Sequence, residues 1–247
     1  MMAGAVRVFP NRLSAARGLA SLVARNAESC ISLRERFSLV LSGGKTPREA
    51  YKLLGDEMAS EIDWTYTHVF WSDERCVPYE HVDNNAKMAR EALLDYVPIP
   101  MDHIHRIQSF LEPGEAAEHY QKDILRYFES RGSAPRFDLI LLGIGADGHT
   151  ASLFPGTPAL EETDRFVVPN YVPSLDSWRI TMTLPLLNAA DQVVFYVLGE
   201  DKAETLARIL SPAGADLPAA RVNPPRGKLT WIVDEGAASL LPKTPFQ

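Results

Sequence analysis

The sequence lacks the features that mark several large classes of protein. It has two cysteines, Cys30 and Cys76, which form no C-x-x-C pair; this fits a reducing compartment and argues against a disulfide framework. No run approaches the roughly 20 continuous apolar residues that a membrane helix requires. The first ten residues, MMAGAVRVFP, lack the long apolar segment and the cleavage site of a signal peptide. We therefore expect a cytoplasmic protein that does not enter the membrane.

An excess of positive charge is also missing. The 25 basic and 32 acidic residues give a formal net charge of -7, which argues against a nucleic-acid partner recruited through bulk charge. This balance does not exclude an anionic small molecule, because a phosphate ester needs only a few local cations and backbone N–H groups.

Length and composition are those of a folded globular chain. Hydrophobic residues make up 46% and charged residues 23% of the 247 positions, close to globular averages. This length suits one large α/β domain or two small ones. The proline-rich segment 211–226 is the best candidate for a mobile loop, but it comes too late in the chain to divide two domains of ordinary size. We therefore predict a single domain over residues 1–247.

Short apolar runs alternate along the chain with segments of helical periodicity. The runs typical of buried strands are residues 37–41, 68–71, 137–142, 166–168, 193–198 and 229–233. The helical pattern covers residues 13–29, 47–58, 86–96, 115–129 and 202–210. The alternation predicts the α/β class, with an open, mostly parallel, doubly wound sheet and helices on both faces. Ligands of such sheets bind beyond the carboxyl ends of the strands, where the candidate motifs should lie.

The first glycine turn, Ser42-Gly43-Gly44, lies between a strand and a helix. Thr46 can cap that helix, and Glu49 falls three residues later, as in a capping box. Two glycines just before a helix let the backbone approach a bound group, and the N–H groups and helix dipole favour an anion. The turn therefore suggests a phosphate site, although a plain strand-to-helix turn would use its glycines in the same way. The Walker A pattern G-x-x-x-x-G-K-[ST] is absent.

Three charged residues, Asp73-Glu74-Arg75, follow the predicted strand 68–71. Such a group is commonly a solvated strand end. Alternatively, Asp73 and Arg75 have the same parity on an extended chain, so one carboxylate and one guanidinium would face the cleft together. The group Asp83-Asn84-Asn85 opens the next helix, where capping alone explains an Asn or Asp.

Residues 143–148 spell G-x-G-x-x-G, but the context argues against a dinucleotide site. That fingerprint needs a long helix and a carboxylate about 20 residues later, whereas Pro155 follows within two turns and the next predicted strand ends without an acid. The glycines instead let the chain reverse and present His149, whose ordinary pKa of about 6.5 suits proton transfer. Asp147 could orient the histidine or bond its own backbone in an Asx-turn.

Two cations late in the chain also fall at element ends. Arg179 lies at the start of an alternating strand, and Lys202 follows the predicted strand 193–198. A ligand could reach both, although each could equally be a surface charge. His103 and His105 have no third metal partner in view, so we interpret them as structural or surface residues and predict no metal site.

Together these motifs resemble the 6-phosphogluconolactonases, within a wider family that includes the glucosamine-6-phosphate deaminases. The matching segments are LSGGKTP (41–47), WSDERCVP (71–78), NNAKMAREALL (84–94), LLGIGADGHTASLFPGTPAL (141–160), WRITMTLPLLNAA (178–190), VLGEDKA (197–203) and LTWIVDEGAA (229–238). They occur in the family's order and span nearly the whole chain. The GADGHTASLFPGTPAL block is the most specific.

The resemblance implies a Rossmann-like topology without a nucleotide, no cofactor and no obligatory metal. It implies hydrolysis of the sugar phosphate 6-phospho-D-glucono-1,5-lactone to 6-phosphogluconate in the pentose phosphate pathway. His149 would be the general base, while Asp147 and Asp73 would orient it or fix a sugar hydroxyl. The residues that would bind the substrate and its phosphate are Ser42, Gly43, Gly44, Arg75, Asn85, Arg179 and Lys202.

Two alternatives remain open. A deaminase would bind a similar ligand, but its corresponding block usually reads Phe-Asn-Glu-Pro-Gly, whereas residues 152–156 read Ser-Leu-Phe-Pro-Gly. The missing glutamate favours the lactonase. A non-catalytic sugar-phosphate sensor would keep the anion site and lose the base, and His149 argues against it. The chain also departs from the lactonases, which often have Ser-Asn-Tyr where it has Asn84-Asn85-Ala86.

Overall fold

Two sheets of unequal size organise the computed structural model, which describes residues 4–130 and 132–242. The larger sheet is parallel throughout, and its strands in spatial order are β1 (Ala5–Phe9), β9 (Lys228–Asp234), β8 (Gln192–Val197), β5 (Leu139–Leu142), β2 (Phe37–Leu41) and β3 (Thr67–Trp71). The smaller, antiparallel sheet has the order β4 (Asp73–Arg75), β7 (Ser177–Met182) and β6 (Val167–Val172). The predicted α/β class with a mostly parallel sheet is confirmed.

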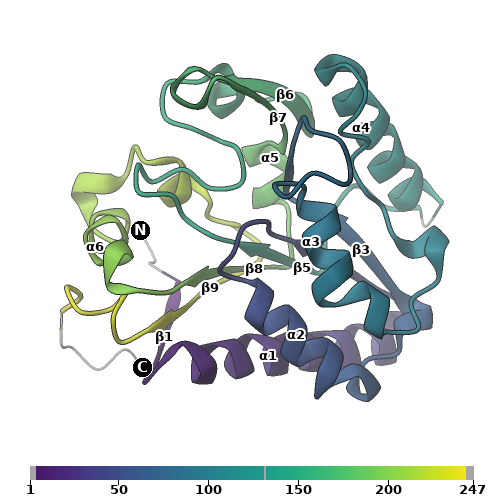
Figure 1. Ribbon diagram of the computed structural model, residues 1–247, viewed down its shortest axis with the longest axis horizontal. Coiled ribbons are helices and arrows are strands. Elements are labelled where there is room, and N and C mark those ends of the chain that lie inside the picture. The colour runs from purple at the N-terminus through teal and green to yellow at the C-terminus, as the bar shows by residue number, and fades with distance from the viewer. Residues whose placement is uncertain (1–3, 131, 243–247) are drawn as a thin grey trace.

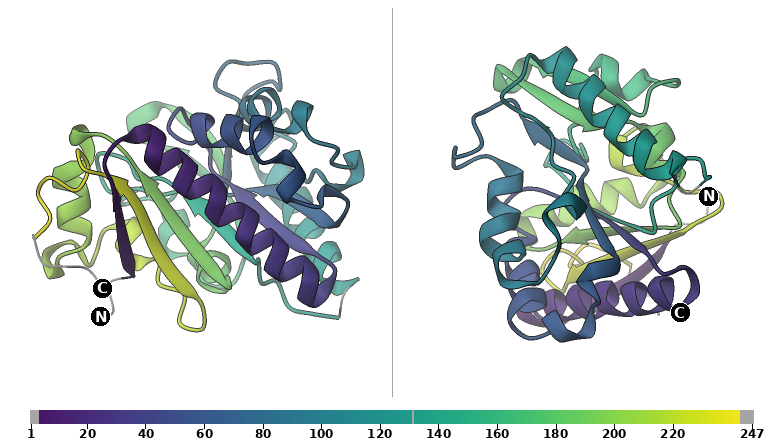
Figure 2. Two further views of the ribbon diagram at one scale, coloured as in Figure 1. Left: turned by 90° about the horizontal axis from the view of Figure 1, so that it is seen from below. Right: turned by 90° about the vertical axis from the view of Figure 1, so that its right-hand side faces the viewer.

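Helices pack on both sides of the larger sheet. They are α1 (Arg12–Arg34), α2 (Arg48–Asp56), α3 (Asn85–Ala92), α4 (Pro113–Glu129), α5 (Leu184–Asn188) and α6 (Ala203–Ile209). Figure 1 shows α1 and α2 along one face of this sheet, and the smaller sheet with α4 and α5 on the other side. In the left view of Figure 2, α1 lies in front of the strands of the larger sheet. No helix among the described residues combines the length and hydropathy that a bilayer span needs.

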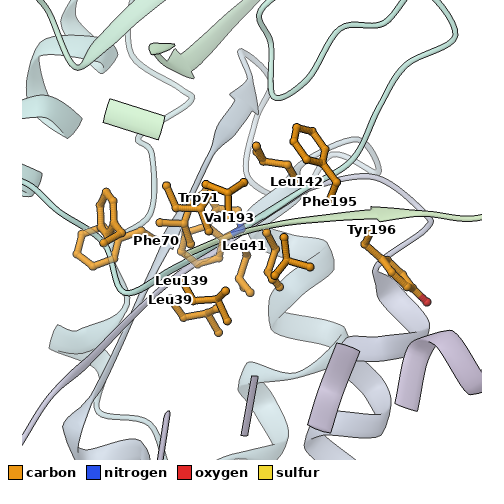
Figure 3. Packing of buried hydrophobic residues seen from close by; sticks show 14 of the residues in the cluster. Leu39, Leu41, Phe70, Trp71, Leu139, Leu142, Val193, Phe195 and Tyr196 are labelled. Atoms are coloured by element: carbon orange, nitrogen blue, oxygen red, sulfur yellow. The ribbon is translucent and has the colours of Figure 1, made fainter. Parts of the chain in front are cut away.

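The inner strands of the larger sheet form the core. Every residue of β2, β3 and β5 is buried, which explains why these strands are nearly continuous in apolar residues. Figure 3 shows side chains from these strands and from β8 gathered into one cluster. On the neighbouring pair of strands, the ring of Phe195 stacks on that of Trp231 with 4.1 Å between centroids. This packing holds neighbouring strands of the larger sheet together.

Buried strands were predicted from the sequence more accurately than exposed or charged ones. The predicted strand 37–41 matches β2 at both ends. In contrast, β1 was not predicted, because it lies at the edge of the sheet and only Val6 of its five residues is buried. Such a strand carries no continuous apolar run. The three-residue β4 was also missed, since charged side chains occupy all of it.

The start of α2 differs from the prediction. Pro47 occupies the N-cap position and α2 begins at Arg48, so Thr46 and Glu49 form no capping box. The loop after β2 continues through Thr46 as a turn, which places its hydroxyl too early to cap the helix. The start of α3 agrees with expectation, because the side chain of Asn84 accepts a hydrogen bond from Lys87 N at 2.8 Å.

Two tyrosine hydroxyls satisfy the backbone where strands β2 and β3 end. The hydroxyl of Tyr51, on α2, accepts from Ser42 N at 3.0 Å and donates to Ser42 O at 2.9 Å. The hydroxyl of Tyr120, on α4, accepts from Trp71 N at 2.8 Å and donates to Trp71 O at 2.9 Å. Both tyrosines are 2% exposed, and burial raises the pKa of each phenol. Each helix is thereby tied to one strand end.

We expect Tyr51→Phe and Tyr120→Phe each to lower the free energy of unfolding by about 1–3 kcal/mol, because each leaves a buried N–H and a buried C=O without a partner. Urea unfolding followed by circular dichroism measures this quantity. Tyr66→Phe is the matched control, since Tyr66 is 42% exposed. Midpoints equal to wild type in both buried variants would contradict the assigned role of the hydroxyls.

Candidate active site

A cavity of about 220 Å³ opens at the carboxyl ends of β2, β3, β5 and β8. The segments that follow these strands supply its walls, as expected for an open parallel sheet. Eight of the predicted site residues line it: Ser42, Gly43, Gly44, Asp73, Arg75, Asn85, His149 and Lys202. Two predicted residues, Asp147 and Arg179, lie outside its lining and contact residues that belong to it. Segments far apart in the sequence thus meet in one site.

The glycine turn after β2 is shaped by two different requirements. Gly44 has a φ of +86°, a conformation that favours glycine. Gly43 faces the side chain of Asn85 so closely that a Cβ there would overlap its amide. Asn85 in turn donates from Nδ2 to Asp73 O at 2.9 Å. The absence of a side chain at Gly43 therefore allows α3 and the segment after β3 to close around the turn.

The loop after β5 is a tight reversal that presents His149. Its backbone is closed by hydrogen bonds from Gly148 N to Gly145 O at 3.1 Å and from Gly145 N to His149 O at 2.9 Å. Gly148 has a φ of +81°. A Cβ at Gly145 would overlap the imidazole of His149. Gly148 therefore serves the turn, and Gly145 leaves the space that the histidine ring occupies.

Asp147 contacts His149 in two ways. Its Oδ1 lies 2.6 Å from His149 Nδ1 and also accepts from His149 N at 3.1 Å. Asp147 thus makes both contacts that the sequence left open, one to the imidazole and one to the backbone of its own turn. A carboxylate beside Nδ1 favours a proton on that nitrogen, which leaves Nε2 with its lone pair. The pair is suited to general-base chemistry.

Asp73 has a different set of contacts. Its Oδ2 accepts from Ser152 Oγ at 2.6 Å, and its Oδ1 accepts from Ser72 Oγ at 3.2 Å. The side chain is buried and lines the cavity. Asp73 thus connects β4 with the segment that follows His149, whereas Asp147 is the carboxylate in contact with the imidazole.

Two arginines lie opposite each other on neighbouring strands of the smaller sheet. Arg75 of β4 and Arg179 of β7 are register partners, and the buried Nε of each has no hydrogen-bond partner among the described residues. Burial and the charge of Arg75 lower the pKa of Arg179. Arg75 also donates from a terminal nitrogen to Asp83 O at 2.5 Å. A pair of like charges with unused donors is suited to an anion.

Glu74 was not predicted as a site residue, yet it organises this wall. Its carboxylate is 1% exposed and accepts the backbone N–H groups of Arg75 at 2.8 Å, Asn85 at 2.8 Å and Ala86 at 2.9 Å. The last two are otherwise unsatisfied donors of the first turn of α3. Alternation along β4 is the signal that could have found it, because it points Glu74 away from Asp73 and Arg75, toward α3. Burial raises its pKa to about 7, opposed by the three N–H donors.

His105 lies outside the cavity lining and belongs to a separate polar cluster. Its Nε2 lies 3.0 Å from Nδ1 of His68, and its Nδ1 lies 2.9 Å from Asp123 Oδ2. The ring of His103 stacks on that of His68 with 3.7 Å between centroids. Within residues 4–130 and 132–242, no group of three or more histidine, cysteine or acidic side chains is placed to hold a metal ion.

Comparison with known proteins gives consistent matches. The model of the family glucosamine-6-phosphate isomerases/6-phosphogluconolactonase matches residues 10–231. The 6-phosphogluconolactonase of Homo sapiens is 41% identical over 252 residues, which cover 99% of this chain and 96% of that protein. That of Nostoc sp. is 38% identical over 240 residues, covering 96% and 98%. The crystal structure of devB protein has a TM-score of 0.88 at 32% identity, over 96% of this chain and 99% of that one.

Glu74 should give the fold a distinct pH dependence. Its pKa is about 7 in the folded chain and near 4.5 when unfolded, so the folded state binds more protons between these values. The free energy that this group contributes is therefore fully present below about pH 4.5 and lost as the pH rises through 7. Glu74→Gln cannot titrate, so between pH 5 and pH 8 wild type should lose stability relative to the variant. Urea unfolding at four pH values measures the free energy of unfolding of both proteins. The same pH dependence in wild type and in Glu74→Gln would contradict this prediction.

Proposed function

The chain belongs to the glucosamine-6-phosphate isomerase/6-phosphogluconolactonase family and groups there with 6-phosphogluconolactonases; from this premise we propose that it hydrolyses 6-phospho-D-glucono-1,5-lactone to 6-phospho-D-gluconate with His149 as general base. The observation that carries the assignment of the base is the 2.6 Å contact between Asp147 Oδ1 and His149 Nδ1. His149 lines the same cavity as the glycine turn and two cations.

The hydrolysis needs one base that later returns its proton. His149 Nε2 takes a proton from water, and the resulting hydroxide attacks C1 of the lactone. Arg75, in the cavity wall, would stabilise the negative charge that develops on the carbonyl oxygen. The imidazolium, stabilised by Asp147, then protonates the ring oxygen as the C1–O bond breaks. The products are the open-chain acid and a histidine restored to its neutral form.

The phosphate would be bound by backbone and cationic groups together. The N–H groups at Gly43 and Gly44 are the backbone donors, and Lys202 lies across the cavity from them on the segment after β8. Arg179 lies beside Arg75 on the neighbouring strand, so its positive charge would attract the phosphate from behind the cavity lining. Binding the phosphate far from C1 uses its interaction energy to orient the carbonyl toward His149.

A deaminase function is less well supported by the residues beside the base. In the alignment of the proline-glycine pair, Phe154 stands where the deaminase pattern carries its glutamate. The ring of Phe154 stacks on that of His149, with 3.9 Å between centroids. Opening and isomerising an amino sugar requires several proton transfers, whereas lactone hydrolysis requires chiefly one base. An aromatic ring in that place supplies no second acid.

The substrate assignment is tested with freshly prepared lactone. We expect the protein to accelerate formation of 6-phosphogluconate well above the spontaneous rate, and to release no ammonia from glucosamine 6-phosphate. Ammonia release without lactone turnover would support the deaminase instead. Binding of 6-phosphogluconate with neither reaction would support a sensor.

His149→Ala should lower kcat by about 10²–10⁴-fold, the usual contribution of general-base catalysis, and leave KM within a few-fold. Steady-state hydrolysis corrected for the spontaneous reaction measures both constants. His119→Ala is the control, because the His119 side chain is 52% exposed on α4. Unchanged turnover in His149→Ala would remove this residue from the mechanism.

Arg179→Ala and Lys202→Ala should act mainly on KM. Lys202→Ala removes a charge-assisted contact to the phosphate, and Arg179→Ala removes a positive charge from the wall behind it. KM should therefore rise about 10- to 100-fold with a smaller change in kcat. Arg208→Ala, an exposed arginine on α6, controls for the loss of net positive charge. A KM that matches wild type in Arg179→Ala would exclude this arginine from phosphate binding.

A further inference from the structure

The imidazole of His149 is held by more than its hydrogen bond to Asp147. The ring of Phe154 lies against it with 3.9 Å between centroids and 25° between planes. A Cβ at Gly145 would overlap the same imidazole. The imidazole of His149 therefore has the Asp147 carboxylate at Nδ1, the Phe154 ring against one face and the backbone of Gly145 close by.

Phe154 is itself firmly placed. Its side chain is 6% exposed, and its carbonyl accepts from Thr157 N at 3.2 Å and from Thr157 Oγ1 at 2.8 Å. Asn170 of β6 donates from Nδ2 to the same Thr157 hydroxyl at 3.0 Å. The backbone of Phe154 is thus tied through Thr157 to β6 of the smaller sheet.

The stacking supplies a constraint that Asp147 alone cannot supply. A single contact at Nδ1 fixes one atom of the imidazole and leaves the ring free to tilt about that point. A parallel aromatic face fixes the ring plane, and with it the direction of the Nε2 lone pair. Proton transfer is sensitive to that direction, because an error of about 1 Å in a catalytic group can cost about 10²-fold in rate.

We propose that Phe154 is a positioning residue that sets the plane of the His149 imidazole for proton abstraction; this rests on the proposed role of His149 as general base. Phe154 is not among the residues that line the cavity, so it acts through the histidine and not on the substrate. Its removal should therefore change turnover and leave substrate binding nearly unaltered.

The kinetic test compares Phe154→Leu with wild type and with Phe154→Tyr. We expect Phe154→Leu to lower kcat about tenfold with KM within twofold, and Phe154→Tyr, which keeps the aromatic face, to retain most of the turnover. Phe128→Leu is the matched control: Phe128 is 3% exposed on α4 and makes edge-to-face contacts with Tyr127 and Phe137. It removes a buried aromatic ring without touching His149, so its kcat should match wild type.

A second comparison distinguishes loss of His149 positioning from a general disturbance of the fold. In a His149→Ala background, with enzyme in excess over lactone, Phe154→Leu should cause no further loss, because the group that it positions is gone. A loss of kcat equal in both backgrounds would overturn the proposal. So would wild-type kcat in Phe154→Leu, or an equal fall in kcat in Phe128→Leu.

A readout independent of activity distinguishes this proposal from the proposed function. In the proton NMR spectrum, the hydrogen-bonded Nδ1–H of His149 should exchange slowly with water in wild type and in Phe128→Leu, and rapidly in Phe154→Leu. Equal exchange in all three proteins would overturn the positioning role even if the lactone is hydrolysed. Failure of wild type to hydrolyse lactone, with the exchange pattern as expected, would refute the reaction and leave the positioning of the ring supported.

Discussion

Buried backbone groups at the ends of parallel strands need hydrogen-bond partners, and this constraint shapes the whole site. Where β2 and β3 end, no further strand residue is available, and the hydroxyls of Tyr51 and Tyr120 supply the partners. After β5, the carbonyl of Gly143 accepts from Thr150 Oγ1 at 2.9 Å. Each of these three strand ends is thus held by the hydroxyl of a side chain, so the groups that follow the strands keep defined positions.

The same requirement explains how three consecutive charged residues can occupy one short strand. Alternation sends Asp73 and Arg75 to the cavity and Glu74 to the start of α3. A buried carboxylate is costly unless it is hydrogen-bonded, and the first N–H groups of a helix lack partners. At Glu74 the buried carboxylate and the first N–H groups of α3 satisfy each other by hydrogen bonds. The result is a rigid wall that holds Arg75 and Asn85 together.

The sequence predicts best what depends on burial or on local turns. The buried strand β2 and the histidine turn follow from apolar runs and glycine spacing. The edge strand β1 and the true start of α2 depend on pairing and loop geometry, which local patterns do not encode. Contacts between segments far apart in the chain, such as Ser152 with Asp73, could not be predicted from a single sequence. The stacking of Phe154 on His149 is closer in sequence, but it depends on the positive φ of Ala151 between them.

The facing arginines, Arg75 and Arg179, carry a thermodynamic consequence for the chain as a whole. Two guanidinium groups side by side repel each other, so the fold contains a local strain that a bound anion would relieve. Ligand binding and folding stability are then linked, since any anion that prefers the folded state shifts the unfolding equilibrium. A neutral side chain in place of one arginine would remove this repulsion, and it would also weaken the binding of an anion.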